Sequence, residues 1–167
     1  MSICAFTGYR PHKLPFGGDE RHPDCEKLKQ KLFCEILRLT REGVNVFISG
    51  MAQGVDTWAA EIVLQLKTTL PSRNIQLWAA IPYDKQSDPW SDAAKVRYQE
   101  ILARADSVEY VSHEYTRGCL QKRNRFMVDA ATHLIAVYDG QPGGTQSTIE
   151  YARKKGLNIT IIEPRGG

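Results

Sequence analysis

The glycine-rich stretch SGMAQGVD, residues 49–56, has the composition of a turn that can hold an anion, and it leads into an amphipathic segment. Backbone N–H groups at the start of a helix attract phosphate, so we expect a phosphate against the turn Gly50–Gly54. Asp56 stands in the first helical turn, where it could cap the helix or accept hydrogen bonds from a ribose. The candidate ligand-binding residues of this stretch are Ser49, Gly50, Gly54 and Asp56.

A second glycine-rich stretch, DGQPGGTQSTIE, follows an apolar run and precedes a basic helical tail. Its backbone N–H groups, together with nearby hydroxyls, suit a phosphate. The candidate binding residues are Gly143, Gly144, Thr145 and Ser147. Glu150 lies further along the same segment. It could pair with Arg123, bind a ribose, act as an acid or base, or be a solvated surface glutamate.

Cations and aromatic residues follow other apolar runs. In TGYRP, Thr7 and Gly8 allow a tight turn and close approach to a ligand, and Arg10 could bind phosphate or carboxylate with its guanidinium fork. In KRNR, Lys122, Arg123 and Arg125 stand at a helix start, where cations are unfavourable unless an anion compensates them. The alternative is solvated surface charge. Tyr83 and Trp90, between residues 82 and 90, could stack on a base or simply pack.

Alternating apolar runs and amphipathic segments must position these loops. Strand-like runs cover residues 3–7, 44–49, 75–81, 107–112, 133–138 and 158–163, and their continuous apolar character predicts parallel strands covered on both faces. Helical spacing predicts helices over 24–42, 56–69, 91–105, 119–131 and 146–156. The pattern predicts one Rossmann-like α/β domain over residues 1–167, a three-layer sandwich with a mainly parallel sheet of about six strands.

The loops that follow strands differ from the loops that follow helices. Glycines, arginines, aromatic residues and acids gather after the strands, whereas the loops before the strands are plain. In a doubly wound sheet all strand-to-helix loops meet at the carboxyl edge, where ligands bind. We therefore expect one functional edge rather than scattered turns.

Composition, charge and cysteine spacing argue against several classes of protein. With 42% hydrophobic and 25% charged residues, the chain has an ordinary globular composition, and a net charge of +3 does not by itself argue for DNA binding. We expect no signal peptide, because no basic, apolar leader opens the sequence, and no membrane span, because no run of about 18 apolar residues occurs. The four cysteines form no CxxC pair, which favours reduced thiols in the cytoplasm and no metal site.

Together, SGMAQGVD, RNR and GGT ahead of a helix resemble the SLOG superfamily of Rossmann-like proteins. SGMAQGVD is similar to the signature of the DprA/Smf DNA-processing proteins, and TGYRP with the short length most resembles the YpsA-type branch. That branch implies a nucleotide-binding protein of unsettled activity. The resemblance covers nearly the whole chain.

The stretch from Pro142 to Glu150 also resembles the PGG-x-GT-x-x-E motif of LOG-type phosphoribohydrolases, once called lysine decarboxylases. That resemblance places the catalytic pair on Arg123 and Glu150, for cleavage of the N-glycosidic bond of a nucleoside monophosphate. Asn124, Gln146 and Ser147 depart from the motif, which alters the phosphate loop but keeps its backbone donors.

These resemblances imply a protein that binds a nucleotide-derived small molecule, such as one related to ADP-ribose or NAD, as a sensor or processing protein. Phosphoribohydrolase activity and single-stranded DNA binding are the alternatives, and the low net charge weighs against the second. No cofactor is expected to be required, although a nucleotide could be bound. Formation of a homo-oligomer is expected by analogy alone.

Overall fold

The computed structural model describes residues 1–165, which form a six-stranded, fully parallel sheet with the strand order β4-β3-β2-β1-β5-β6. The strands are β1 (Ile3–Gly8), β2 (Val46–Ser49), β3 (Gln76–Ile81), β4 (Ser107–Tyr110), β5 (His133–Val137) and β6 (Asn158–Ile162). All six lie where the sequence predicts strands. The Rossmann-like α/β prediction is therefore confirmed.

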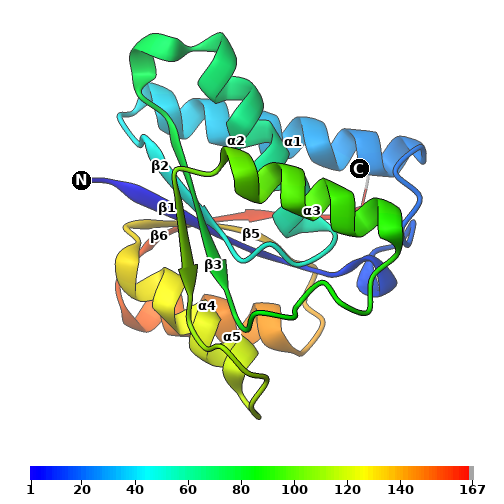
Figure 1. Cartoon of the computed structure of the whole chain (residues 1–167). Coiled ribbons are helices and arrows are strands. Elements are labelled where there is room, and N and C mark those ends of the chain that lie inside the picture. The colour runs from blue at the N-terminus through cyan, green and yellow to red at the C-terminus, as the bar shows by residue number, and fades with distance from the viewer. Residues whose placement is uncertain (166–167) are drawn as a thin grey trace.

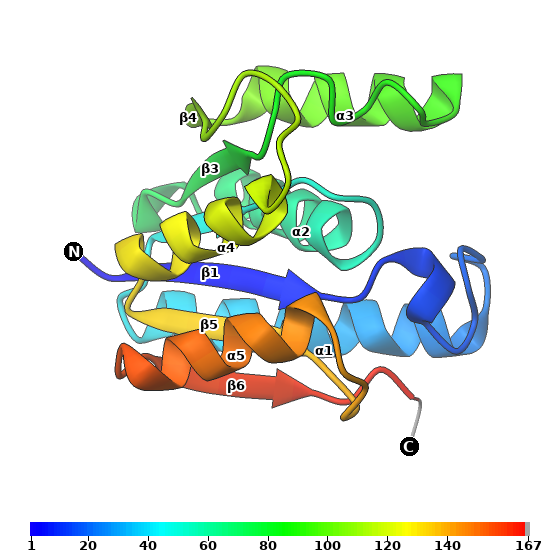
Figure 2. The same ribbon diagram turned by 90° about the horizontal axis from the view of Figure 1, so that it is seen from below.

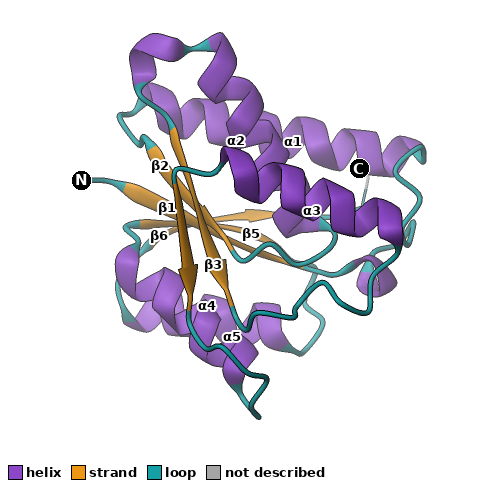
Figure 3. Cartoon of the chain, viewed as in Figure 1, coloured by secondary structure: helices purple, strands orange, loops and turns teal. Residues whose placement is uncertain are grey.

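Helices cover both faces of the sheet and make the expected three layers (Figures 1 and 3). One face carries α1 (Pro23–Arg41), α2 (Val55–Thr69) and α3 (Asp92–Arg104), and the other carries α4 (Cys119–Ala130) and α5 (Gly144–Lys154). Two short 3-10 turns, η1 (Pro11–Lys13) and η2 (Pro71–Arg73), complete the elements. The helical predictions are confirmed, but α5 begins two residues earlier than expected, which places Gly144 and Thr145 inside its first turn.

Apolar periodicity accounts for this arrangement. Every residue from Ile3 to Thr7 is buried, as expected of a central strand covered on both faces. Phe6 and Phe47 stack with ring centroids 6.0 Å apart between the sheet and its first helical layer. On α1 the buried positions Leu28, Leu32, Ile36 and Leu39 recur at helical spacing and face the sheet.

The two edge strands depart from the expected burial. β4 has two half-buried and two exposed residues, and β6 is largely half-buried or exposed, with Ile161 46% exposed. Each edge strand pairs with one neighbour only. The prediction that all strands are covered on both faces is therefore wrong for these two, because position in the sheet decides coverage and an apolar run does not encode that position.

The strand order reverses between β1 and β5. From β1 the chain moves outward through β2, β3 and β4, and then returns to add β5 and β6 on the other side of β1. β1 leads to α1 on one face, whereas β5 leads to α5 on the opposite face. Figure 2 shows β1, β5 and β6 pointing the same way, toward the segment that follows β1. Such a reversal opens a crevice at the carboxyl ends of the strands.

Candidate functional site

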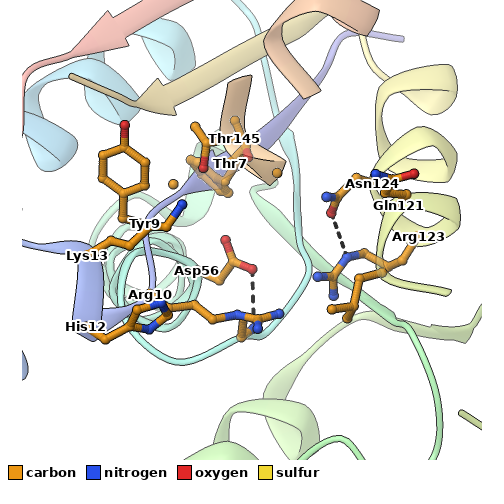
Figure 4. Close-up of a pocket in the computed structure, with 15 residues that line it drawn as sticks. Thr7, Tyr9, Arg10, His12, Lys13, Asp56, Gln121, Arg123, Asn124 and Thr145 are labelled. Atoms are coloured by element: carbon orange, nitrogen blue, oxygen red, sulfur yellow. Dashed lines mark hydrogen bonds between the residues drawn. The ribbon is translucent and has the colours of Figure 1, made fainter. Parts of the chain in front are cut away.

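A cavity of about 320 Å³ lies at this reversal point. Figure 4 shows the residues that line it, which come from the end of β1, the segment after it, the start of α2, and the first turns of α4 and α5. The lining residues are Phe6, Thr7, Gly8, Tyr9, Arg10, His12, Lys13, Ala52, Asp56, Leu120, Gln121, Arg123, Asn124, Gly144 and Thr145.

The first turn of α5 forms one wall of the cavity. Gly143 precedes the helix without a side-chain cap, and the first turn has no acidic residue. The first N–H groups of a helix lack intrahelical partners and carry the positive end of the helix dipole. This wall therefore offers backbone donors to an anion, with Gly144 and Thr145 lining the cavity.

Side chains from the segment after β1 contact the loop between β5 and α5. Tyr9 donates a hydrogen bond from its hydroxyl to Asp139 Oδ1 at 2.6 Å, and the hydroxyl accepts one from the Asp139 N–H. Lys13 Nζ lies 5.8 Å from the centroid of the Tyr9 ring and donates to the carbonyl of Pro142 at 3.1 Å. These contacts fix the Lys13 ammonium beside the uncapped start of α5.

Arg123 is a buried cation between the ends of β2 and β3. It is 3% exposed, and Nη1 donates to the carbonyls of Gly50 at 2.6 Å and Ala80 at 3.3 Å. Nε donates to the side chain of Asn124 at 2.9 Å. Desolvation lowers the pKa of the guanidinium, although the nearby Asp56 opposes this effect. No ion pair within the described residues involves Arg123, so its positive charge is left for an anion to balance.

Asp56 supplies the only carboxylate among the lining residues. It is 8% exposed, and its Oδ2 accepts a hydrogen bond from the Ala52 N–H at 3.2 Å. Burial raises the pKa of this carboxyl, against the field of Arg123 and Arg10 and the Ala52 hydrogen bond. Asp56 thus braces the turn before its own helix, and it still faces the cavity.

Comparison with known proteins shows the family of this chain. The family model described as the YspA SLOG family, YpsA, matches residues 4–165. The chain belongs to this family. It is 33% identical to a UPF0398 protein of Halalkalibacterium halodurans over 98% of this chain and 89% of that protein. It is also 32% identical to a UPF0398 protein of Bacillus cereus over 93% and 85%.

Solved structures of DprA share the fold of this YpsA-family chain. DprA from Streptococcus pneumoniae matches with a TM-score of 0.65 and 18% identity, over 100% of this chain and 51% of that one. DprA from Helicobacter pylori, described in a single-stranded DNA binding mode, matches with a TM-score of 0.65 and 20% identity, over 96% and 64%. The chain therefore spans only about half to two thirds of these DprA chains, and the likeness shows the fold alone.

In the YpsA-family structure, seven of the ligand-binding residues predicted from sequence line the cavity. They are Thr7, Gly8, Arg10, Asp56, Arg123, Gly144 and Thr145. Gly8 has an additional reason to be glycine, because a Cβ there would lie 2.6 Å from a methyl group of Val55 on α2. The predicted edge of the sheet is thus the edge that forms the cavity.

The predicted phosphate turn at Gly50–Gly54 lies beside the cavity, and only Ala52 and Asp56 of this stretch line it. Ser49 is fully buried, and its hydroxyl donates to the Asp56 carbonyl at 2.9 Å and accepts from the Met51 N–H at 3.1 Å. Asp56 takes the Ala52 N–H. A Cβ on Gly50 would lie 2.6 Å from the Arg123 guanidinium. The Ser49 hydroxyl and the N–H groups of Met51 and Ala52 are thus used inside the turn. Ser49 and Gly50 position Asp56 and Arg123 instead of lining the cavity, and a phosphate at the start of α2 stays a prediction.

Other predicted residues lie outside the cavity. Gly54 has a φ of +88° and faces a neighbouring hollow, and Gly143, with a φ of +143°, precedes α5 beside Lys13. Arg125 and Ser147 line a separate hollow of about 100 Å³ between α4 and α5, where the Arg125 guanidinium lies 5.3 Å from the centroid of the Tyr151 ring. The charges of Arg125 and Lys122 are exposed.

The structure does not bring Glu150 to Arg123. Glu150 is exposed on α5, is absent from the cavity wall, and forms no ion pair with Arg123 in residues 1–165. The buried face of α5 carries Thr145, Thr148, Ile149 and Ala152, and the helical period turns Glu150 away from it. The structure thus fits the interpretation of Glu150 as a solvated surface glutamate, and the catalytic pair implied by the resemblance stays a prediction that this arrangement does not support.

Tyr83 and Trp90 line an adjoining hollow of about 430 Å³. This hollow shares Arg10, His12, Ala52 and Leu120 with the first cavity. Both aromatic rings also pack on protein, since Tyr83 meets Tyr115 edge-to-face at 5.2 Å and Trp90 meets Tyr98 in the same way. The two hollows therefore adjoin each other across Arg10, His12, Ala52 and Leu120.

Sequence reasoning missed several lining residues, chiefly Tyr9, His12, Lys13, Gln121 and Asn124. The signal for three of them was present, because they belong to TGYRPHK, which directly follows the central strand.

Among residues 1–165, every helix is too short or too polar to span a membrane. Residues 1–165 also contain no group of three or more His, Cys, Asp or Glu side chains arranged to hold a metal ion.

Proposed function

We propose that this chain binds a nucleotide-derived ligand whose phosphate lies against the first turn of α5. The observation that carries the proposal is the charge of the cavity wall. Arg10, Lys13 and Arg123 are cations, and Asp56 is the single carboxylate among the lining residues. The wall therefore has an excess of positive charge beside an uncapped helix start, and both attract an anion.

The phosphate is best accommodated between Lys13 and the start of α5. Lys13 is held there by its contacts to Pro142 and the Tyr9 ring, so little side-chain entropy is lost when an anion binds. The N–H groups of the first turn point along the helix axis toward the same space. An ammonium and backbone donors together form a common way of binding phosphate.

The nucleoside would extend toward the second hollow. Arg10 and His12 line both hollows, and Tyr83 and Trp90 stand at the far end. Aromatic rings bind nucleobases by stacking, which contributes about 1–3 kcal/mol per base. A ligand with phosphate at one end and a flat ring at the other matches these two adjoining hollows.

Melting temperature measured with added nucleotides tests the proposal. A ligand that binds only the folded state raises the melting temperature with concentration. We expect nucleoside diphosphates to do so for the natural chain and for Lys154→Ala, and to do so much less for Lys13→Ala. Lys154 is an exposed lysine in the last turn of α5, so its substitution is the matched control. Equal shifts in both variants would mean that phosphate is held elsewhere.

Single-stranded DNA binding is the alternative to be tested, because the Helicobacter pylori protein of the same fold is described in a single-stranded DNA binding mode. Fluorescence anisotropy with a labelled oligonucleotide at low and high salt examines it, since DNA binding falls steeply as salt rises. Hydrolysis of an N-glycosidic bond is not part of the proposal, because Glu150 lies outside the cavity.

A further inference from the structure

We infer that Asp56 makes the cavity select ligands carrying ribose hydroxyls, so that ribonucleotides bind and the sugar-phosphate chain of DNA does not. The inference rests on the proposed function, because it concerns the same cavity.

The carboxylate of Asp56 has one oxygen free for a ligand. Oδ2 is occupied by the Ala52 N–H, and no hydrogen bond from residues 1–165 reaches Oδ1. In the described residues, no fully buried side-chain oxygen or nitrogen lacks a partner. Oδ1 must therefore touch the open cavity. In Figure 4 the carboxylate lies between Arg10, Lys13 and Thr145, all of which line the same space.

In its ionised form, which the nearby Arg123 and Arg10 favour, Asp56 does not place this free oxygen against a phosphate. A carboxylate only accepts hydrogen bonds, and two negative groups in contact repel each other strongly where water is scarce. Asp56 is nine-tenths buried and no ion pair in the described chain involves it. The phosphate must then lie on the Lys13 and α5 side, and a hydrogen-bond donor of the ligand must face Asp56.

Ribose hydroxyls are the donors that a nucleotide offers next to its phosphate. A ribonucleotide has them at C2′ and C3′, whereas a nucleotide inside a DNA chain has no hydroxyl at C2′ and an esterified oxygen at C3′. DNA would therefore leave Oδ1 desolvated and without a partner. Leaving a buried charged acceptor unsatisfied costs more than an ordinary hydrogen bond contributes, and a site built around such an acceptor strongly rejects ligands that lack the donor.

Isothermal titration calorimetry with two matched series of probes tests this inference. The natural chain is titrated with ribonucleoside 5′-diphosphates and with their 2′,3′-dideoxy counterparts. We expect the ribonucleotides to bind at least about tenfold more tightly. In Asp56→Asn the Ala52 N–H keeps the amide oxygen on its own side, so the amide NH₂ faces the cavity. The NH₂ can donate only a neutral hydrogen bond to a ribose hydroxyl, which is weaker than the bond that the charged carboxylate accepts. The preference should then fall below about threefold.

Inorganic pyrophosphate shows whether the Asp56→Asn cavity remains intact. It has no hydroxyl for Asp56, so Asp56→Asn should bind it at least as tightly as the natural chain does. Glu150→Gln, which alters a carboxylate outside the cavity, should keep the full preference for ribose.

The other possible results of these titrations contradict either the role of Asp56 or the proposed function. Equal binding of both series by the natural chain overturns the inference while leaving the proposed function standing. Loss of pyrophosphate binding in Asp56→Asn also overturns it, because Asp56 would then act only on the structure of the turn. A DNA oligonucleotide that binds as tightly as the ribonucleotides overturns it as well. If neither series nor pyrophosphate binds, the proposed function fails and the inference fails with it.

Discussion

At the scale of single residues, Arg123 connects the fold to the site. Its guanidinium holds the carbonyls that follow β2 and lie within β3, and it also lines the cavity. Gly50 has no side chain in the space that the guanidinium occupies. The backbone and Asn124 satisfy its hydrogen bonds, but no carboxylate within the described residues is ion-paired with it. Such a buried cation stabilises the structure through its hydrogen bonds, and it also adds positive charge to the cavity wall.

We predict that Arg123→Lys lowers the free energy of unfolding by about 2–4 kcal/mol, because an ammonium cannot reproduce the planar fork that meets Gly50, Ala80 and Asn124. Urea denaturation measures the change. Arg125→Lys, on the exposed face of the same helix, is the control and should cost under about 0.5 kcal/mol. Similar costs in the two variants would contradict the supporting role of Arg123.

Lys122, Arg123 and Arg125 differ in burial, and this difference could not be predicted from the sequence. The three cations stand within four positions of one helix and look alike in the sequence. Only the packing of α4 against β1 and β3 turns Arg123 inward and leaves the others exposed. The same holds for Ser49. Its hydroxyl bonds backbone groups of Met51 and Asp56, and only the conformation of the turn brings these groups to it. The residue types identified the edge of the sheet, but side-chain direction required the fold.

At the scale of elements, the segment between β1 and α1 carries Arg10, His12 and Lys13 into the cavity and is fastened at its other end. Phe16 lies 6.1 Å from Trp58 of α2, between ring centroids, and is buried. Glu20 forms salt bridges with Arg97 of α3 at 2.7 Å and Lys29 of α1 at 2.8 Å. Hydrogen bonds to Arg97 and Lys29, partly offset by desolvation, lower the pKa of Glu20 to about 2.

This low pKa predicts a pH-dependent contribution of Glu20 to stability. In the unfolded chain Glu20 has a pKa near 4.5, so the unfolded state takes up the proton first as pH falls. The stabilisation is fully present above that value and is lost as pH falls toward about 2. We expect Glu20→Gln to cost no more than about 1 kcal/mol at pH 7, because the pair is partly exposed.

Unfolding of the natural chain and of Glu20→Gln, measured between pH 7 and pH 2, follows this difference. The gap in the free energy of unfolding should narrow steadily as the pH falls below the unfolded value. A gap that stays constant over this range would mean that charge at Glu20 does not fasten the segment.

The elements themselves could be predicted from the sequence, because continuous apolar runs and helical spacing mark them directly. The exact start of α5 could not, since Gly144 and Thr145 read equally well as loop. That difference matters for the site, because it decides that these two residues present a helix start to the cavity.

At the scale of the whole molecule, strand order creates the site. The sequence predicts a parallel sheet but does not state that β5 lies beside β1. This adjacency brings Tyr9 to Asp139 and Lys13 to Pro142, pairs that are each about 130 positions apart in the chain. Strand pairing of this kind depends on the packing of all layers together and leaves no local mark in the sequence. The charged cavity is thus a product of topology.

Substitutions at Gly144 test whether this cavity binds phosphate at the start of α5. A Cβ at Gly144 would meet open space, so Gly144→Asp and Gly144→Asn both fit the fold. They differ chiefly in charge, and a carboxylate at a helix start does not destabilise the helix.

Isothermal titration calorimetry of pyrophosphate and nucleoside diphosphates against the natural chain and both Gly144 variants is the decisive measurement. We expect Gly144→Asp to weaken binding at least about tenfold more than Gly144→Asn, because the charge of the aspartate repels the phosphate. Equal affinities for the two variants would contradict phosphate binding at the start of α5.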